Sequence, residues 1–212
     1  MDNHFIVAKD GWRYVGFFVV LTFAGFTFRH GYILYVPSIV LLLFVVWFFR
    51  DPERKTPEGD SVLSPADGTV IKIEKNNKYE QFMGKDAVCI SIFMSVLNVH
   101  VNRFPVNGTV ADKQYNKGRF HVAHVDKASE FNEQTALFIK DDKDRKLVVV
   151  QIAGFVARRI VCNIDRGSRM TAGKKYGMIK FGSRLDVYVE PGREIKVSRG
   201  DKTRAGETII AR

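Results

Sequence analysis

Two long apolar runs in the first 49 residues limit most strongly what this chain can fold into. Residues 14–28 read YVGFFVVLTFAGFTF and residues 30–49 read HGYILYVPSIVLLLFVVWFF, with Arg29 between them. About 20 helical residues cover about 30 Å, so the second run alone reaches the length of a membrane span. Neither run is followed by a small-residue cleavage site, which argues against a removed signal peptide. We therefore predict that residues 1–50 form a membrane-anchoring segment of one or two helices.

Basic residues flank this segment on both sides, namely Lys9 and Arg13 before it and Arg50, Arg54 and Lys55 after it. If both runs span, the two ends share one face, and the positive-inside rule places that face in the cytoplasm. The sequence therefore predicts a protein of the cell membrane whose catalytic domain lies on the cytoplasmic face. Gly31 and Pro37 leave a kinked or re-entrant hairpin that only dips into the bilayer as an alternative.

The rest of the chain has a strand-like pattern. The stretch 51–60, which begins DPERKTP, is polar and has two prolines, so we interpret it as a linker before a domain at 61–212. Short β-branched runs broken by Gly, Asp and Asn predict strands there. The predicted strands are 69–74, 87–93, 108–112, 136–140, 146–153, 160–164, 178–181, 185–189 and 194–197. Helical periodicity is weak outside 95–99, so the fold class is mainly β, or strand-dominated α+β, with a barrel-sandwich-like architecture.

The last residues, KVSRGDKTRAGETIIAR, predict a terminal hairpin. Its first strand is expected to end at Gly200-Asp201 and its second to begin after Gly206-Glu207, because these glycines suit turns. The earlier segment ADGTVIKIE is interpreted as a partner strand. Small barrel-sandwich carrier domains have hairpins of this kind.

Charge indicates an anionic partner. The formal net charge is +10, and residues 154–180 carry seven Lys or Arg, including Arg158 and Arg159, against the single acid Asp165. Arginine forks match phosphate oxygens, and the predicted anchor favours an anionic membrane over nucleic acid. No stacking aromatics are interleaved with these charges, so nucleic acid is not expected. Cys89 and Cys162 are too few for a disulfide framework and are expected to be free thiols.

Individual motifs are weak when taken one at a time. Gly182-Ser183 lies between two strand-like runs, where a tight turn is expected, and no Gly-x-Ser-x-Gly surrounds it. Asp67 in SPADG and His100 in NVHVNRFP are common as structural residues. His121 and His124 are three apart, which on a strand places them on opposite faces, and no metal or nucleotide motif occurs. No metal site is predicted.

Taken together and in order, four segments resemble the phosphatidylserine decarboxylase family, most closely its short form. They are SPADG, MSVLNVHVNRFPVNG, IAGFVARRI and GMIKFGSRLDVYVEP. The resemblance covers roughly residues 50–212 and extends to the hydrophobic N-terminus. It implies a membrane enzyme that converts phosphatidylserine to phosphatidylethanolamine and CO2.

The resemblance also implies a proenzyme. Ser183 would attack the carbonyl of Gly182 to give an ester, elimination would then leave dehydroalanine, and its hydrolysis would give a pyruvoyl group and ammonia. The products would be a β chain, residues 1–182, and an α chain, residues 183–212, which begins with the pyruvoyl cofactor. The substrate amine would then form a Schiff base with this group before CO2 leaves.

The family's processing site resembles a serine protease triad, which here matches Asp67, His100 and Ser183. Longer members have His-x-x-His-x-Pro, whereas this chain has His100 and then Arg103 at the second position. Arginine cannot act as a base near neutral pH, so His100 could serve both in processing and in protonation. Alternatively, His121 or His124 replaces the missing histidine.

Binding residues and rival functions complete the hypothesis. Arg103, Arg158 and Arg159 are candidates for binding the carboxylate or phosphate of the lipid. A pyruvoyl enzyme with another amine substrate is one alternative. A membrane-tethered carrier or transport module without catalysis is another, with Lys202 as its nearest modifiable lysine. The sequence leaves the formation of a homo-oligomer open.

Overall fold

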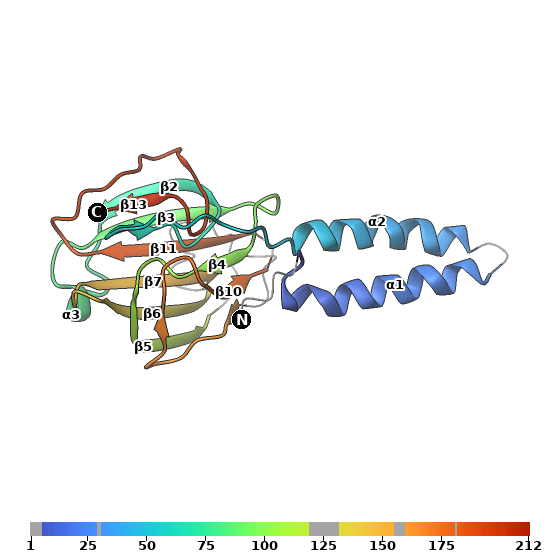
Figure 1. Ribbon diagram of the computed structural model, residues 1–212, viewed down its shortest axis with the longest axis horizontal. Coiled ribbons are helices and arrows are strands. Elements are labelled where there is room, and N and C mark those ends of the chain that lie inside the picture. The colour runs from blue at the N-terminus through green and yellow to red at the C-terminus, as the bar shows by residue number, and fades with distance from the viewer. Residues whose placement is uncertain (1–5, 29–30, 119–131, 155–159, 181) are drawn as a thin grey trace. The chain divides into compact units, whose positions relative to one another are not determined.

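A computed structural model describes residues 6–28, 31–118, 132–154, 160–180 and 182–212. The chain divides into two compact units, Met1–Glu53 and Arg54–Arg212, and each is described by itself. The first is helical and the second is built almost entirely from antiparallel strands, as Figure 1 shows. Both features confirm the predicted fold class.

The N-terminal unit is a helical hairpin. The 3-10 helix η1 (Lys9–Gly11) leads into α1 (Trp12–Phe26), and α2 (Tyr32–Phe48) packs along it (Figure 1). Gly25 allows the close approach, because a Cβ there would lie 2.9 Å from the Tyr35 backbone nitrogen. The rings of Phe26 and Tyr35 stack at 4.4 Å, and Thr22 Oγ1 lies 2.9 Å from Ser38 Oγ. Small and aromatic residues therefore fix the pairing of the two helices.

The two helices are short, with 15 residues in α1 and 17 in α2. Within the described part of the chain, no helix combines the length and the apolar character needed to cross a membrane. Most large side chains of both helices, including Phe17, Phe23 and Leu43, are nevertheless exposed and apolar.

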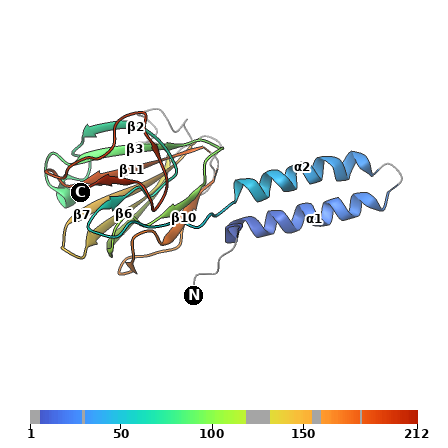
Figure 2. The ribbon, with the colours of Figure 1, turned by 45° about the horizontal axis from the view of Figure 1, so that its top comes forward.

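The second unit contains three sheets. The largest has the strand order β12-β2-β3-β11-β7-β6-β5-β9, the second β4-β10-β8 and the third β1-β13. Figure 2 shows how the large sheet curls from β2 through β3, β11 and β7 to β6. The strands are β1 (Val62–Leu63), β2 (Gly68–Lys75), β3 (Val88–Met94), β4 (Val101–Arg103), β5 (Gly108–Lys117), β6 (Glu133–Asp141), β7 (Lys146–Ala153), β8 (Ile160–Cys162), β9 (Arg169–Met170), β10 (Lys175–Ile179), β11 (Ser183–Val189), β12 (Lys202–Thr203) and β13 (Ile209–Ala211).

The large sheet is buried on both faces by different elements. Alternate side chains of its central strands, such as Leu137, Val149 and Val187, pack with residues of the two smaller sheets in the main core. The opposite side chains form a second core beneath the short helix α3 (Glu80–Met83), where Tyr79 packs edge-on against Phe138 and Tyr188. Burial on both faces explains why β7 is a continuous apolar run with few polar positions.

Three local expectations differ from the structure. Residues 95–99 form a turn and not a helix, because Asn98 Oδ1 accepts from both the backbone and the hydroxyl of Ser95. Residues 194–197 make one bridge, Ile195 to Ala211, and no strand. The arms of the terminal hairpin meet at the Ile195–Ala211 bridge, but the expected connection between them contains a strand, because β12 pairs with β2. The predicted partnership of ADGTVIKIE with the terminal segment is confirmed by the β2–β12 pair.

Asp141 fastens the turn between β6 and β7 and makes stability depend on acid. Burial alone would raise the pKa of Asp141, but hydrogen bonds from the backbone and side chain of Arg145 outweigh it and lower the pKa. The lowered value means that stabilisation is present above the unfolded pKa, near about 4, and is lost as pH falls through the folded value. We expect Asp141→Asn to lower Tm by about 4–8 °C at pH 7, for a loss of about 2 kcal/mol.

The measurement is thermal unfolding of both proteins from pH 7 to pH 3. The difference in Tm between wild type and Asp141→Asn should shrink as the pH falls below about 4. A difference that stays constant across this range would show that the carboxylate charge is not the source of the stabilisation.

Candidate active site

Ser183 begins β11 and lies inside the molecule. It pairs with Met94 of β3 on one side and with Ala153 of β7 on the other. Leu185 and Val187 belong to the main core, so strand alternation turns the Ser183 side chain to the same face. The residue is fully buried, and its hydroxyl has no hydrogen-bond partner within the described residues. A buried hydroxyl without a partner costs stability, which favours a chemical role over a structural one.

Gly182 places the peptide before Ser183 in a conformation that favours glycine. Its φ is +49°, in the left-handed region where a side chain is strained. A Cβ at this position would meet no described atom within 4 Å, so the demand is conformational and not one of space. The expected tight connection between two strands is confirmed, since β10 ends at Ile179 and β11 starts at Ser183.

His100 lies against the same connection from the neighbouring sheet. It is fully buried, and its Nδ1 lies 2.9 Å from the carbonyl oxygen of Ile179. A carbonyl can only accept, so this contact requires the ring hydrogen on Nδ1 and makes Nε2 the basic nitrogen. The structure therefore places the His100 ring beside the end of β10, with its Nδ1 hydrogen directed at Ile179.

Two donors hold the Asp67 carboxylate, and the sequence does not reveal either contact. Its Oδ1 accepts from the backbone nitrogen of Ala205 at 2.8 Å, and its Oδ2 accepts from Arg54 at 2.7 Å. The Arg54 side chain is 7% exposed and also lies 3.5 Å from Glu207. The nearly buried pair joins the start of the domain, the SPADG turn and the C-terminal loop.

Sheet register gives the separation of Asp67 and Ser183. Thr69 faces Phe93, and Ser183 faces Met94, so Asp67 and Ser183 lie at the same end of the sheet. Two strand spacings separate β2 from β11, which is about 10 Å. The carboxylate and the hydroxyl are therefore too far apart for a direct hydrogen bond, and a third group has to connect them.

Arg103 lies at the SPADG turn. Its guanidinium donates to the carbonyl of Gly173 at 3.0 Å, and its backbone nitrogen donates to Pro65 at 3.0 Å. A Cβ on Gly206 would lie 2.9 Å from its Cδ, so the C-terminal loop packs directly on its stem. These contacts join β4 to two turns, and lipid binding by Arg103 stays a prediction.

Two buried amides near Ser183 escaped the sequence analysis. Gln151 Nε2 donates to Asn102 Oδ1 at 2.8 Å, and both residues are fully buried. The signal was present: Gln151 is a polar residue at a core-facing position of KLVVVQIA, and Asn102 follows His100 by two. Both were passed over because neither amides nor this spacing form a known motif.

Four candidates lie outside the described residues: Arg158, Arg159, His121 and His124. Their roles therefore stay predictions. Among the described residues, no group of three or more His, Cys, Asp or Glu side chains could hold a metal ion.

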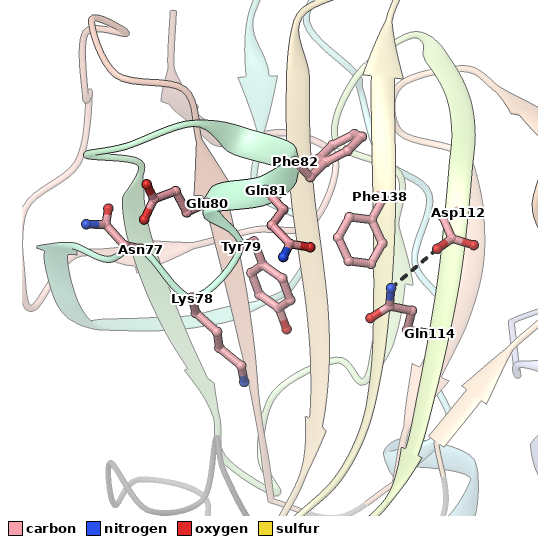
Figure 3. A pocket seen from close by; sticks show the side chains of 9 residues that line it. All are labelled: Asn77, Lys78, Tyr79, Glu80, Gln81, Phe82, Asp112, Gln114 and Phe138. Carbon is pink, nitrogen blue, oxygen red and sulfur yellow. Dashed lines mark hydrogen bonds between the residues drawn. The ribbon is translucent and has the colours of Figure 1, made fainter.

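A broad open depression of about 850 Å³ lies elsewhere, over the second core. Figure 3 shows its aromatic wall of Tyr79, Phe82 and Phe138, with Lys78 and Gln114 at its edges. Phe138 belongs to the second core, whereas Ser183 faces the main core. None of the predicted site residues that the structure describes lines this depression, so we place the chemistry at Ser183 and not here.

Comparison with known proteins identifies the family of this chain. The sequence model of the family described as phosphatidylserine decarboxylase matches residues 41–211. A phosphatidylserine decarboxylase proenzyme of Geobacter metallireducens is 45% identical over 209 residues, covering 96% of this chain and 95% of the relative. One of Chlorobium phaeovibrioides is 51% identical over 176 residues, covering 82% and 79%, and one of Polynucleobacter asymbioticus is 44% identical over 213 residues, covering 100% and 97%. The chain therefore belongs to the phosphatidylserine decarboxylase family and is an enzyme of the decarboxylase class.

Proposed function

We propose that this enzyme decarboxylates phosphatidylserine to phosphatidylethanolamine and CO2, with a pyruvoyl group that it makes by cutting itself between Gly182 and Ser183. One observation carries the proposal: a buried serine hydroxyl, with no partner among the described residues, directly follows a glycine at φ +49°. The relatives named proenzymes support the same conclusion, because a proenzyme has to be processed.

The first step of the self-cleavage needs only groups of this chain. Ser183 Oγ attacks the carbonyl carbon of Gly182, the peptide C–N bond breaks, and the hydroxyl proton ends on the Ser183 nitrogen, which leaves an ester. Loss of the proton on the Ser183 α-carbon then expels the Gly182 carboxylate and cuts the chain, and water converts the resulting dehydroalanine to the pyruvoyl group and ammonia. His100 is the candidate base, because its contact with Ile179 leaves Nε2 as the proton acceptor. Asp67 would act through a connecting group, given its separation from Ser183. The left-handed conformation of Gly182 supports the step, since strained backbone is common where a chain reacts with itself.

The surroundings of Ser183 fit a pyruvoyl group. That group supplies an electrophilic carbonyl for the substrate amine and takes up the electrons released when CO2 leaves. Residue 183 would hold it covalently in β11, between Met94 and Ala153. Apolar neighbours disfavour a buried carboxylate, which would promote its loss as neutral CO2. His100 is the candidate donor of the proton that replaces it.

Cleavage would leave the two chains strongly associated. The new α chain would begin with β11, whose register with β3 and β7 runs from Ser183 to Val189 on both sides. β12 and β13 pair with β2 and β1 of the β chain, and Arg193 donates to Asp141 at 3.3 Å. No strand is interrupted by a cut at Gly182–Ser183, so the fold supports processing without dissociation.

The apolar helical hairpin supports action at a membrane. Its large apolar side chains are exposed in this unit, and an exposed apolar surface of this size indicates a lipid or protein contact. We propose that it anchors the enzyme at the cell membrane, with the catalytic unit on the cytoplasmic face and anionic lipid as its surface partner.

The carrier alternative loses its main support. A carrier lysine has to stand at an exposed hairpin tip, whereas Lys202 is in β12 and pairs with Thr69. The remaining alternative is a pyruvoyl enzyme with another amine substrate, and the experiment has to distinguish it from a phosphatidylserine decarboxylase.

The test is an intact mass of the purified full chain followed by an assay. We expect a fragment that begins at residue 183 with a pyruvoyl group, and release of CO2 from phosphatidylserine vesicles but not from free serine. A single unmodified chain would contradict the self-cleavage. Activity on free serine equal to that on vesicles would contradict the lipid substrate.

A further inference from the structure

The main core contains a polar cluster over the start of β11. Three core-facing positions of neighbouring strands are occupied by Met94, Ser183 and Ala153, which form one row across β3, β11 and β7. In the next row, Gln151 of β7 faces Leu185 of β11. Diagonal neighbours of this kind are within reach of long side chains, so Gln151 and Ser183 belong to one neighbourhood.

Asn102 bridges β11 from above. Its side chain accepts from Gln151 on β7 at 2.8 Å and contacts Met94 Sδ on β3 at 3.8 Å. β7 and β3 flank β11 on opposite sides, so a side chain that touches both has to lie over β11. Because Met94 pairs with Ser183 and Gln151 with Leu185, the bridge crosses the strand at its first residues.

Several polar atoms of this cluster lack a strong hydrogen-bond partner among the described residues. Asn102 Nδ2 donates only to a thioether, a weak acceptor, among the described residues. Gln151 Oε1 and Ser183 Oγ are also buried without a partner within the described part of the chain. A Cβ on Gly177 would come within 3.1 Å of Gln151 Nε2, so β10 closes over the pair. Buried polar groups kept at such a cost indicate a function that uses them.

We propose that Asn102 donates a hydrogen bond to the oxygen of Gly182 during self-cleavage, and that Gln151 is the positioning residue that orients Asn102. The inference rests on the proposed self-cleavage at Gly182–Ser183. When Ser183 Oγ bonds the Gly182 carbonyl carbon, the former carbonyl oxygen of Gly182 carries negative charge until the C–N bond breaks. A donor whose resting partner, within the described part of the chain, is a thioether is suited to this charge, because little is lost when it turns to the new acceptor.

Gln151 contributes by fixing the direction of the Asn102 amide. Its Nε2 donates to Asn102 Oδ1 and, at 3.5 Å, to the carbonyl of Val161, so the donor Nδ2 of Asn102 is directed away from it. Without this bond Asn102 would keep its donor but lose its orientation. The two residues should therefore differ in the size of their effect on cleavage.

The test measures the rate at which the fragment 183–212 appears from the freshly made full chain. We expect Asn102→Leu and Asn102→Asp to slow it by about 100-fold, the usual effect of losing one oxyanion donor, and Gln151→Met by about 10-fold. The double variant Asn102→Leu with Gln151→Met removes both partners together, which is close to neutral for stability. It should unfold near the wild-type temperature and still cleave slowly.

A matched control is available on the other face of the sheet. Gln134 is also buried, but it alternates with residues of the main core and donates no bond to the cluster. Gln134→Met should cleave at the wild-type rate. Wild-type cleavage in a stable double variant would overturn the inference and leave the proposed function intact, whereas a wild-type chain that never cleaves would overturn both.

Hydroxylamine separates the acyl shift from the later steps, because it releases an ester but not a peptide. We expect it to release little fragment from Asn102→Leu, since the ester does not form. Rapid release would show that the ester accumulates, and would overturn the assignment of Asn102 to the acyl shift.

Discussion

We expect the replacement of Ser183 by alanine to leave one chain of 24.1 kDa without decarboxylase activity. The variant lacks the only oxygen that can reach the Gly182 carbonyl from within residue 183, and it cannot generate a carbonyl at its own α-carbon. Both the cut and the cofactor are therefore lost together. A loss of the core-facing hydroxyl costs little stability, because that hydroxyl has no partner among the described residues. Gel migration measures the cut, intact mass detects the pyruvoyl group, and CO2 release measures the decarboxylase activity.

Ser91→Ala is the matched control for this experiment. Ser91 is also buried, and it pairs with Asp186 of β11, but it alternates with the core-facing residues Ile90 and Ile92 and so faces away from Ser183. It should cleave and decarboxylate as the wild type does. The appearance of two chains in Ser183→Ala would remove Ser183 as the nucleophile.

Replacement of Asp67 by alanine should both slow the cut and destabilise the domain. The change leaves the nearly buried Arg54 with Glu207, at 3.5 Å, as its remaining acidic partner among the described residues, and it frees the Ala205 backbone nitrogen. Removing one partner of a buried pair costs about 3 kcal/mol, which corresponds to a Tm lower by about 6–12 °C. Thermal unfolding and the rate of fragment appearance are the two measurements.

Arg54→Met separates the two roles of Asp67. It removes the same ion pair but leaves the carboxylate, so it should lower Tm by a similar amount and still cleave faster than Asp67→Ala. Equal cleavage rates in the two variants would show that Asp67 affects cleavage only through its ion pair with Arg54. Wild-type cleavage in Asp67→Ala would remove it from the processing site.

Local patterns allowed much of the fold to be predicted. The strand 146–153 coincides with β7, and the apolar runs became α1 and α2, because hydrophobic periodicity and turn residues act over a few neighbouring positions. The short helix α3 was missed, since its four residues carry too little periodicity. The connection of the terminal hairpin was wrong, because its residues 202–203 form β12 and pair with β2 of the large sheet.

The candidate site, like the fold, was predictable only in part. Gly182-Ser183 and its tight connection were predictable, because a glycine between two strand patterns demands a local conformation that the chain itself specifies. The sequence by itself thus determined the long strands of the large sheet, the helical hairpin and the glycine-serine dipeptide at their connection. Only the tertiary structure decided that Arg54 holds Asp67 and that Asn102 crosses β11 to reach Gln151, because these partners are set by strand order and register between residues 13 and 49 positions apart.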